Sequence, residues 1–241
     1  MGELPLLEHP EWAAEFPWLA QGVTHRGAAE EPFDLGLSNG TPTELVRGRW
    51  RSVAMAMGAR GVVVGPQPHS SRVLVHQEVP AGLLISRPAD GHATRCGGLL
   101  LGVTIADCVP VSVVDPARRA VALLHAGWRG TAAGVLEAGL SILRDRFGSE
   151  GRGLRVHLGP AICGACYEVG AEVPEALGLP VADEPHHVDL REALTLRCLA
   201  WGVPVEAVTR SGWCTRCGEA DLFSHRRGDP ERQVAFLGVR A

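Results

Sequence analysis

Five short apolar runs in the middle of this 241-residue chain constrain its fold more than any other feature. Runs of about four to eight residues that are rich in Val, Ile and Leu and bounded by Gly or Pro are typical of strands. Strands are predicted at Gly61–Gly65, Val73–Val79, Leu99–Ile105, Val109–Val114 and Ala120–His125. Most of the predicted helices follow this region, so the order of elements favours an α+β fold over regular βαβ alternation.

Helices are predicted from capping residues and apolar periodicity. Thr43 is a candidate N-cap for a helix over residues 44–57 that ends at Gly58. Asp189 and Glu192 form a capping-box pattern for a helix that reaches Trp201. Two further helices are expected at Thr131–Phe147 and Val169–Leu177. Further strands are expected at Leu154–Leu158, Val205–Thr209 and Gln233–Val239, and residues 1–42 are predicted to be irregular except near Gly22–Thr24.

All 23 basic residues are arginine, and the absence of lysine excludes two large classes of enzyme. A P-loop needs its lysine to reach the phosphates, and a pyridoxal phosphate enzyme needs one for its Schiff base. The formal net charge of -4 disfavours general binding to nucleic acid. Any anion that the chain recognises must therefore be held by arginine, by backbone amides or by a metal.

Hydropathy and cysteine content indicate the compartment. The chain has no apolar run of roughly 18 residues, and its N-terminus lacks the basic start of a secretory signal, so no membrane segment is expected. Seven cysteines, an odd number, in a chain long enough for a large core favour a reducing cytoplasm. One domain is expected over residues 1–241.

A predicted hairpin brings a cysteine close to a histidine. The segment Asp115–Arg118 matches a type I turn, with Asp first and Pro second. A hairpin centred between Pro116 and Ala117 would place Cys108 directly opposite His125, with Cβ atoms roughly 4.5–5.5 Å apart. Such a pair can share a metal ion or form a thiolate–imidazolium pair. A slip of one residue would separate the two side chains, and a buried cysteine is more often a small apolar residue.

A second histidine has a position that suits a site residue. His69 lies in the segment Gln67–Ser70, a predicted loop between two strands. Two histidines and one thiolate would leave the fourth position of a zinc ion open, as in catalytic zinc sites. A metal with an open position can activate water.

Four of the cysteines form two spaced pairs. Cys163-x-x-Cys166 and Cys214-x-x-Cys217 have the spacing of a Cys₄ zinc site. Disulfides and free thiols are the alternatives.

Three charged residues are further candidates. Arg129 precedes a predicted helix, and a guanidinium beside a helix N-terminus is suited to phosphate. Arg26 is a weaker candidate by the same logic. Asp107, next to Cys108, either orients a metal ligand or caps a turn.

Four sequence blocks resemble those of the YfiH family, also called laccase-domain or peptidoglycan-editing-factor proteins. They are Ala106–Pro110, His125–Gly130, Gly159–Gly170, and Cys214-Thr215 with Phe223–Arg227. Weaker matches occur at Gln67–His69, Thr24–Gly27 and Leu35–Leu37. The blocks follow the family's order over nearly the whole chain.

The resemblance implies a four-layer α/β/β/α sandwich with mixed sheets, and a zinc ion held by His69, Cys108 and His125. It also implies phosphorolysis of adenosine, inosine, guanosine and methylthioadenosine to base and ribose 1-phosphate, and deamination of adenosine. Older descriptions of the family assign copper-dependent polyphenol oxidation and the correction of peptidoglycan precursors. Cys108, His125 and Asp107 are the expected catalytic residues, and a monomer or small homo-oligomer is expected.

Some positions depart from the family pattern. Pro68 replaces the usual apolar residue before the histidine, and Cys163 stands where a glycine is usual. Contacts along the substrate cleft are therefore expected to differ, whereas the three metal ligands are unchanged.

Three other functions remain open. The same residue pair would suit a cysteine hydrolase, with Cys108 as nucleophile and His125 as base. Multicopper oxidation is disfavoured, because none of the ten histidines forms a His-x-His pair. A binding module with a purely structural metal is the non-enzymatic alternative.

Overall fold

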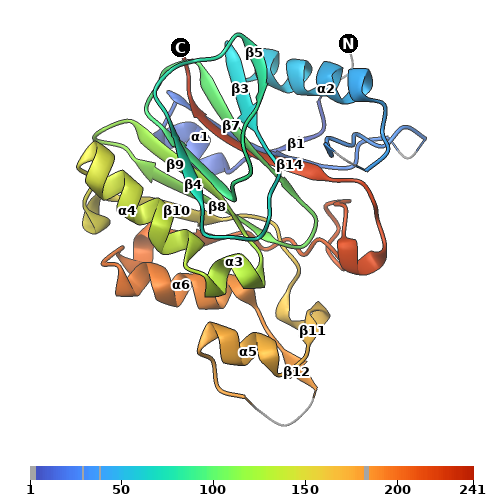
Figure 1. The fold of residues 1–241 in the computed structure, drawn as a ribbon, viewed down its shortest axis with the longest axis vertical. Helices are drawn as coiled ribbons and strands as arrows, with labels where there is room; N and C mark the ends of the chain where they lie inside the picture. Colours follow the sequence, from blue (N-terminus) through green and yellow to red (C-terminus); the bar gives the residue numbers. More distant parts are fainter. Residues whose placement is uncertain (1–3, 29, 38, 182–184) are drawn as a thin grey trace.

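The computed structural model of the protein describes residues 4–28, 30–37, 39–181 and 185–241. In this part of the chain two six-stranded sheets pack face to face, and helices cover both outer faces (Figure 1). The succession of helix, sheet, sheet and helix confirms the four-layer α+β architecture with mixed sheets that the family resemblance implied.

The first sheet joins the two ends of the chain. Its strands, in spatial order, are β1 (Leu6–Leu7), β2 (Leu19–Thr24), β14 (Gln233–Val239), β7 (Leu99–Ile105), β3 (Gly61–Val64) and β5 (Gly82–Ile85). β3 runs parallel to both of its neighbours, and the other pairs are antiparallel. The C-terminal strand β14 therefore lies in the middle of the sheet, between β2 and β7.

The second sheet carries the predicted hairpin at its centre. Its strands, in spatial order, are β13 (Val208–Arg210), β10 (Arg155–Leu158), β8 (Val109–Asp115), β9 (Ala120–Ala126), β6 (Gly91–Thr94) and β4 (Val73–His76). The outer pairs β10–β13 and β4–β6 are parallel, and the three central pairs are antiparallel.

Helices cover the two sheets unequally. α2 (Thr43–Ala56) lies on the first sheet, whereas α3 (Trp128–Ala132), α4 (Val135–Phe147) and α6 (Leu190–Ala200) lie on the second. The short helix α1 (Pro10–Glu15) precedes β2. α5 (Glu172–Leu177) lies beyond α6 with the antiparallel strands β11 (Glu168–Val169) and β12 (His186–His187) (Figure 1).

Alternation along the strands divides the buried side chains into three cores. On β9, Ala122 and Leu124 face the helices, whereas Val121 and Leu123 face the first sheet. The third core lies between α2 and the first sheet and contains Trp50. Because both faces of the central strands are buried, these strands are continuously apolar rather than alternately polar. Full burial stabilises each large apolar side chain by about 1.5–3 kcal/mol.

All five strands predicted for the middle of the chain are present, but β4 ends at His76, three residues before the predicted end, and β5 and β6 were not predicted. β7 has the predicted bounds, and β3, β8 and β9 differ from theirs by one residue at the C-terminal end. β14 also has its predicted bounds. Asp189 is the N-cap of α6, as predicted, but its side chain accepts a hydrogen bond from the Arg191 N–H and not from that of Glu192, the partner in the predicted capping box.

Several helix predictions were wrong in detail. Helix Thr131–Phe147 is divided into α3 and α4, because Gly134 has φ 85°, in the left-handed region that an α-helix excludes. Thr43 is the first helical residue rather than an N-cap. Within the stretch Val169–Leu177, only Glu172–Leu177 is helical, and Val169 belongs to β11.

The predictions for one irregular segment and for one strand were also wrong in part. Residues 1–42 contain α1 and the six-residue strand β2. The stretch Val205–Thr209 begins with a 3₁₀ turn over Val205–Ala207 before β13 starts.

The hairpin register is shifted from the predicted one. Asp115 pairs with Ala120, so the connecting loop has four residues, and His125 pairs with Pro110 instead of Cys108. Arg119 has φ 48°, and the longer loop depends on this residue's left-handed conformation. The shift equals two residues along one strand, so Cys108 and His125 stay on the same face although they are not directly opposite.

Candidate metal centre

His69, Cys108 and His125 meet at one point. One ligand atom from each lies within 4.8 Å of the others. The Cys108 Sγ and His69 Nε2 atoms are 4.0 Å apart, and the two imidazole rings meet edge to face with centroids 4.9 Å apart. All three residues line a cavity of about 380 Å³.

Each of the three side chains comes from a different backbone setting. His125 is the penultimate residue of β9 and is 4% exposed, Cys108 immediately precedes β8, and His69 lies in the loop between β3 and β4. His69 has φ 60° and Asp107 has φ 85°. Non-glycine residues in the left-handed region are uncommon and concentrate at functional sites. The two strained positions aim His69 and Cys108 towards the rigid histidine on β9.

Asp90 organises two of the three side chains, and the sequence interpretation did not identify it. It is fully buried and precedes β6 directly. Its Oδ1 lies 3.0 Å from His125 Nδ1 and accepts a hydrogen bond from the His69 N–H at 2.9 Å. Its Oδ2 accepts from the N–H and the hydroxyl of Ser70. The strand after Asp90 has the sequence Gly-His-Ala-Thr, which is not an apolar run and was not predicted as a strand, so no local signal marked this role.

The contact with Asp90 determines which nitrogen of His125 faces the cluster. Because Nδ1 is occupied by the carboxylate, Nε2 is the nitrogen left for a metal or for Cys108. A carboxylate behind a ligating imidazole fixes the ring orientation and raises its basicity. Burial raises the pKa of Asp90, but the hydrogen bonds from His125 and Ser70 outweigh it, so the pKa is lowered overall and the carboxylate stays charged.

Cys108 and His125 polarise each other. Burial alone would raise the pKa of the Cys108 thiol, but the charge of His125 and hydrogen bonds from both histidines lower it to about 6. Burial would lower the pKa of His125, but the Cys108 thiolate and Asp90 raise it to about 9. Without a metal, the two groups therefore form a thiolate–imidazolium pair at neutral pH.

A glycine beside the cluster keeps the space between the ligands clear. A Cβ atom at Gly127 would lie 2.8 Å from Cys108 Sγ and 3.0 Å from His69 Cδ2. Real Cβ contacts are longer than this, so any side chain here would push the two ligands apart.

The donor set fits a zinc ion chemically. Zinc takes imidazole nitrogen at about 2.0–2.1 Å and thiolate sulfur at about 2.3 Å, which places an N and an S ligand of a tetrahedral site about 3.6 Å apart. The 4.0 Å between Cys108 Sγ and His69 Nε2 is close to that separation. The lowered pKa of Cys108 also suits a metal, because only the thiolate binds one.

Asp107 lies next to the cluster but bonds elsewhere. Its Oδ1 accepts a hydrogen bond from the Thr215 hydroxyl at 2.6 Å, and its Oδ2 accepts from the Arg226 N–H at 2.7 Å. Both contacts tie C-terminal segments to the start of β8. Asp107 is therefore placed to position Cys108 through the backbone, and both of its carboxylate oxygens accept hydrogen bonds from residues outside the cluster.

Arg129 does not line the cavity, although it lies in α3 close to the end of β9. Its side chain is exposed, and its guanidinium lies over the Trp128 ring, 4.2 Å from the centroid. The cavity is lined instead by Arg232 and His225. Arg232 donates from Nη1 to the carbonyl groups of Asp229, Pro230 and Glu231. These two residues are brought to the cluster by the C-terminal segment. His225 belongs to the family block Phe223–Arg227, whereas no local motif marked Arg232.

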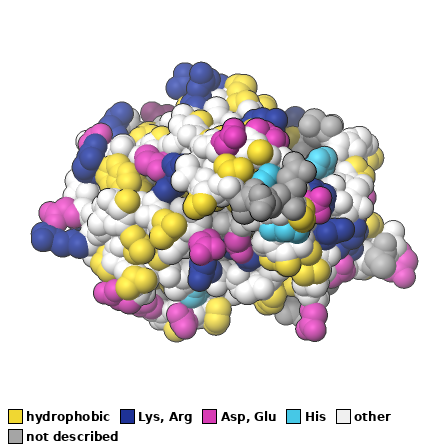
Figure 2. Space-filling model, turned by 90° about the horizontal axis from the view of Figure 1, so that it is seen from below, with side chains coloured by type: hydrophobic (Ala, Val, Ile, Leu, Met, Phe, Trp, Pro, Cys, Tyr) yellow, Lys and Arg dark blue, Asp and Glu magenta, His cyan; other side chains and the backbone are white. Residues whose placement is uncertain are grey.

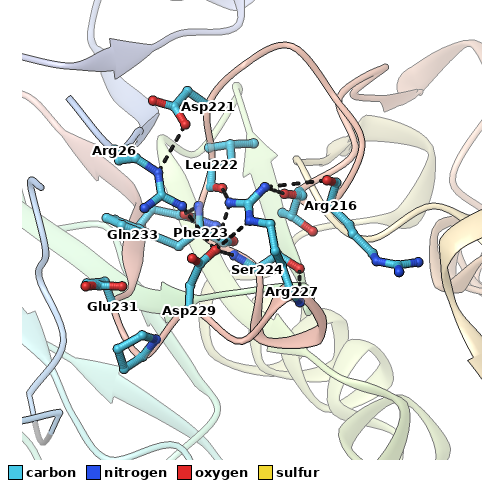
Figure 3. A network of polar contacts seen from close by, with 12 residues as sticks. Arg26, Arg216, Asp221, Leu222, Phe223, Ser224, Arg227, Asp229, Glu231 and Gln233 are labelled. Carbon is cyan, nitrogen blue, oxygen red and sulfur yellow. Dashed lines mark hydrogen bonds and ion pairs between the residues drawn. The ribbon is translucent and has the colours of Figure 1, made fainter. Parts of the chain in front are cut away.

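Arg26 belongs to an ion-pair network rather than to the cavity (Figure 3). Its Nε donates to Asp221 at 3.0 Å and its Nη2 to Asp229 at 3.1 Å. Its guanidinium also lies 4.5 Å from the centroid of the Phe223 ring. Asp229 accepts from Arg227 as well, at 2.7 Å. These contacts account for Arg26 without a bound phosphate.

The surface of the molecule carries mixed charge. On the face seen in Figure 2, acidic and basic side chains are interspersed with small apolar groups. Among the described residues, no helix has both the length and the apolar character needed to cross a membrane.

Comparisons with known proteins agree on one family. A family model described as multi-copper polyphenol oxidoreductase laccase matches residues 20–240. An adenosine deaminase from an unknown prokaryotic organism is 36% identical over 207 residues, covering 78% of this chain and 79% of the relative. A purine nucleoside phosphorylase of Deinococcus radiodurans is 29% identical over 246 residues, covering 98% of this chain and 93% of the relative.

A solved structure extends the agreement to three dimensions. The crystal structure of the Bacillus licheniformis protein YfiH matches with a TM-score of 0.86 at 25% identity, covering 99% of this chain and 97% of that one. The sequence blocks, the four layers and the family model thus agree, and this chain belongs to the YfiH family of laccase-domain proteins.

Proposed function

We propose that this chain is a zinc-dependent purine nucleoside enzyme that phosphorolyses purine nucleosides to base and ribose 1-phosphate and also deaminates adenosine. The observation that carries the proposal is the convergence of His69, Cys108 and His125 in one cavity, with the buried Asp90 behind His125. Relatives named adenosine deaminase and purine nucleoside phosphorylase support the choice of substrate.

His69 Nε2, Cys108 Sγ and His125 Nε2 would hold the ion. Zinc with three protein ligands supplies a Lewis acid at an open position. Asp90 keeps His125 in the tautomer that presents Nε2 to the cavity. Gly127 keeps the space in front of the ligands free for a reacting group.

The substrate would occupy the cavity in front of this cluster. A volume of about 380 Å³ is within the range of small-molecule sites. Arg232 brings positive charge to the wall, which suits phosphate or a developing negative charge. Asn39 and His225 add polar groups of the kind that hydrogen-bond a purine or a ribose.

Incubation of the purified protein with adenosine, with and without phosphate, tests the proposal by chromatography of the products. Adenine and ribose 1-phosphate formed only with phosphate support phosphorolysis, and inosine supports deamination. His69→Ala should abolish both products, whereas His187→Gln, at an exposed histidine of β12, should leave them unchanged. Absence of every product from metal-loaded protein would rule out the proposal.

The identity of the metal is tested in the same preparation. Elemental analysis of protein purified without added metal should find zinc, and His69→Ala should contain one zinc ion fewer per chain. Copper in its place, together with oxidation of a phenol by dioxygen, would favour the polyphenol oxidase activity that the family description names.

A cysteine hydrolase is the second candidate, and the thiolate–imidazolium pair of Cys108 and His125 favours it. In that reaction Cys108 would attack an acyl carbon and His125 would return the proton to the leaving group. Metal removal separates the two functions: hydrolysis of an activated ester by Cys108 should survive chelation, whereas nucleoside turnover should stop.

A further inference from the structure

Four cysteines from two distant segments meet outside the cavity. Cys163 and Cys166 follow β10, and Cys214 and Cys217 follow β13. One Sγ atom from each lies within 4.8 Å of the other three. We propose that these four thiolates bind a second zinc ion, at a structural site that is separate from the His69–Cys108–His125 cluster.

The spacing of the sulfur atoms fits a tetrahedral ion. Four thiolates at about 2.3 Å from a zinc ion are about 3.8 Å from one another. Cys163 Sγ and Cys217 Sγ are 3.9 Å apart. A disulfide would hold two sulfur atoms at about 2.0 Å, and all seven cysteines of the chain are free thiols in the structure.

The segment Cys214–Gly218 has a turn that directs backbone N–H groups at a sulfur. The N–H of Arg216 donates to Cys214 Sγ at 3.4 Å, and the N–H of Cys163 donates to the same atom at 3.3 Å. The N–H of Gly218 donates to the Cys214 carbonyl at 2.9 Å and closes the turn. N–H groups that converge on a sulfur stabilise its negative charge, which a metal-bound thiolate keeps.

Glycine at position 218 is required by this turn. A Cβ atom there would clash with the Cys214 carbonyl oxygen and would lie 2.9 Å from the backbone nitrogen of Cys214. Both neighbouring atoms belong to the backbone, so they cannot move aside as a flexible side chain would. Only glycine at position 218 therefore allows the backbone to pack this closely against Cys214.

The two cysteine segments are already joined by the backbone. Ala161 and Cys214 form a parallel bridge, and the N–H of Thr215 donates to the Ala161 carbonyl at 3.1 Å. Cys214 is buried, whereas Cys217 is exposed and gives an ion access from solvent. Preformed geometry together with an entry path is what a protein metal site requires.

The proposed ion would brace the neighbouring catalytic segment. Four protein ligands leave no open position, as in structural zinc sites. Ile162 donates from its N–H to the Asp107 carbonyl at 3.0 Å, and Thr215 donates from its hydroxyl to the Asp107 carboxylate at 2.6 Å. Both residues are adjacent to a proposed ligand, so the ion would hold Asp107, and through it Cys108, in place.

Zinc content per chain tests the site. The wild-type chain should hold two zinc ions, whereas His69→Ala and Cys217→Ser should each hold one, because each substitution disables one site. Cys96→Ser is the matched control, since Cys96 lies outside both clusters, and it should keep two. If the His69 cluster takes no zinc, wild type and His69→Ala should both hold one ion, and Cys217→Ser should hold none.

X-ray absorption at the zinc edge of His69→Ala gives a second readout that needs no cysteine variant. A shell of sulfur alone at about 2.3 Å is expected. A shell that contains nitrogen, the same zinc content in Cys217→Ser as in the wild-type chain, or a disulfide among the four cysteines in freshly purified protein would overturn the proposal.

Discussion

Asp90 holds His125 at two points: its carboxylate lies 3.0 Å from His125 Nδ1, and its carbonyl accepts the His125 N–H at 2.7 Å. The side chain and the backbone of the histidine are thus both fixed by one residue. The same carboxylate accepts the His69 N–H, so one buried charge orients two of the three candidate metal ligands.

Asp90→Asn should weaken zinc binding about 10–100-fold, which is typical when the carboxylate behind a ligating histidine is lost. The amide nitrogen of asparagine cannot accept from Ser70 or His125, so the free energy of unfolding should also fall by about 1–3 kcal/mol. Chelator competition measures the affinity, and urea denaturation measures the stability. Asp145→Asn, at an exposed residue paired with Arg144, should change neither. Unchanged zinc affinity in Asp90→Asn would show that the carboxylate does not support the metal ligands.

Gly127→Ala should abolish nucleoside turnover and zinc binding at the His69 cluster. The added methyl group would lie 2.8 Å from Cys108 Sγ and force the ligands apart. Metal analysis and product chromatography measure the loss. Gly48→Ala is the matched control, because a Cβ atom there meets nothing within 4 Å. Since Gly48 lies inside α2, that change should leave activity intact and raise stability by about 0.5–1 kcal/mol. Full activity in Gly127→Ala would show that a methyl group at this position does not displace Cys108 and His69.

Cys108 of the metal-free protein should react with iodoacetamide much faster at pH 7 than an ordinary thiol. The charge of His125 lowers the pKa of Cys108 to about 6, so the thiolate predominates at neutral pH. His125→Gln removes that charge and should slow the reaction several-fold, and added zinc should protect the sulfur. Mass spectrometry of the peptide that contains Cys108 follows the rate. A rate that is independent of both His125 and zinc would contradict the proximity of these groups.

The protein should lose stability as the pH falls below about 6.5. Burial, together with the charge of His9, lowers the pKa of His157 from 6.5 to about 3. Between these values the unfolded chain binds a proton that the folded chain does not, so acid favours unfolding by up to about 1.4 kcal/mol per pH unit. His92, also buried, has its pKa lowered to about 3 and acts in the same direction.

Urea denaturation midpoints at pH 7.5 and pH 5.5 test this dependence. His157→Gln cannot take up the proton, so its stability should fall less between the two values than that of the wild-type chain. An equal fall in both proteins would exclude His157 as a source of the acid sensitivity.

Local patterns in the sequence were sufficient for several strands, for the cap of one helix and for part of the site. Apolar runs such as Leu99–Ile105 and Gln233–Val239 have the strand bounds that the structure shows, because burial on both faces leaves a continuous apolar signal. The Asp189 cap of α6 is likewise a local hydrogen bond. Cys108 and His125 were expected to be neighbours because a hairpin is a short-range structure.

Tertiary structure decided what depends on contacts between distant segments. The four-residue loop after Asp115 shifted the register, because the left-handed Arg119 within it carries no strong sequence signal. Asp90 reaches His125 only because β6 pairs with β9, and Arg232 reaches the cavity only after the C-terminal segment folds back. The two Cys-x-x-Cys pairs likewise meet only because the strands that precede them, β10 and β13, pair with each other. Short-range periodicity specifies which residues form a strand, whereas pairing between strands and the path of the loops decide which side chains share a site.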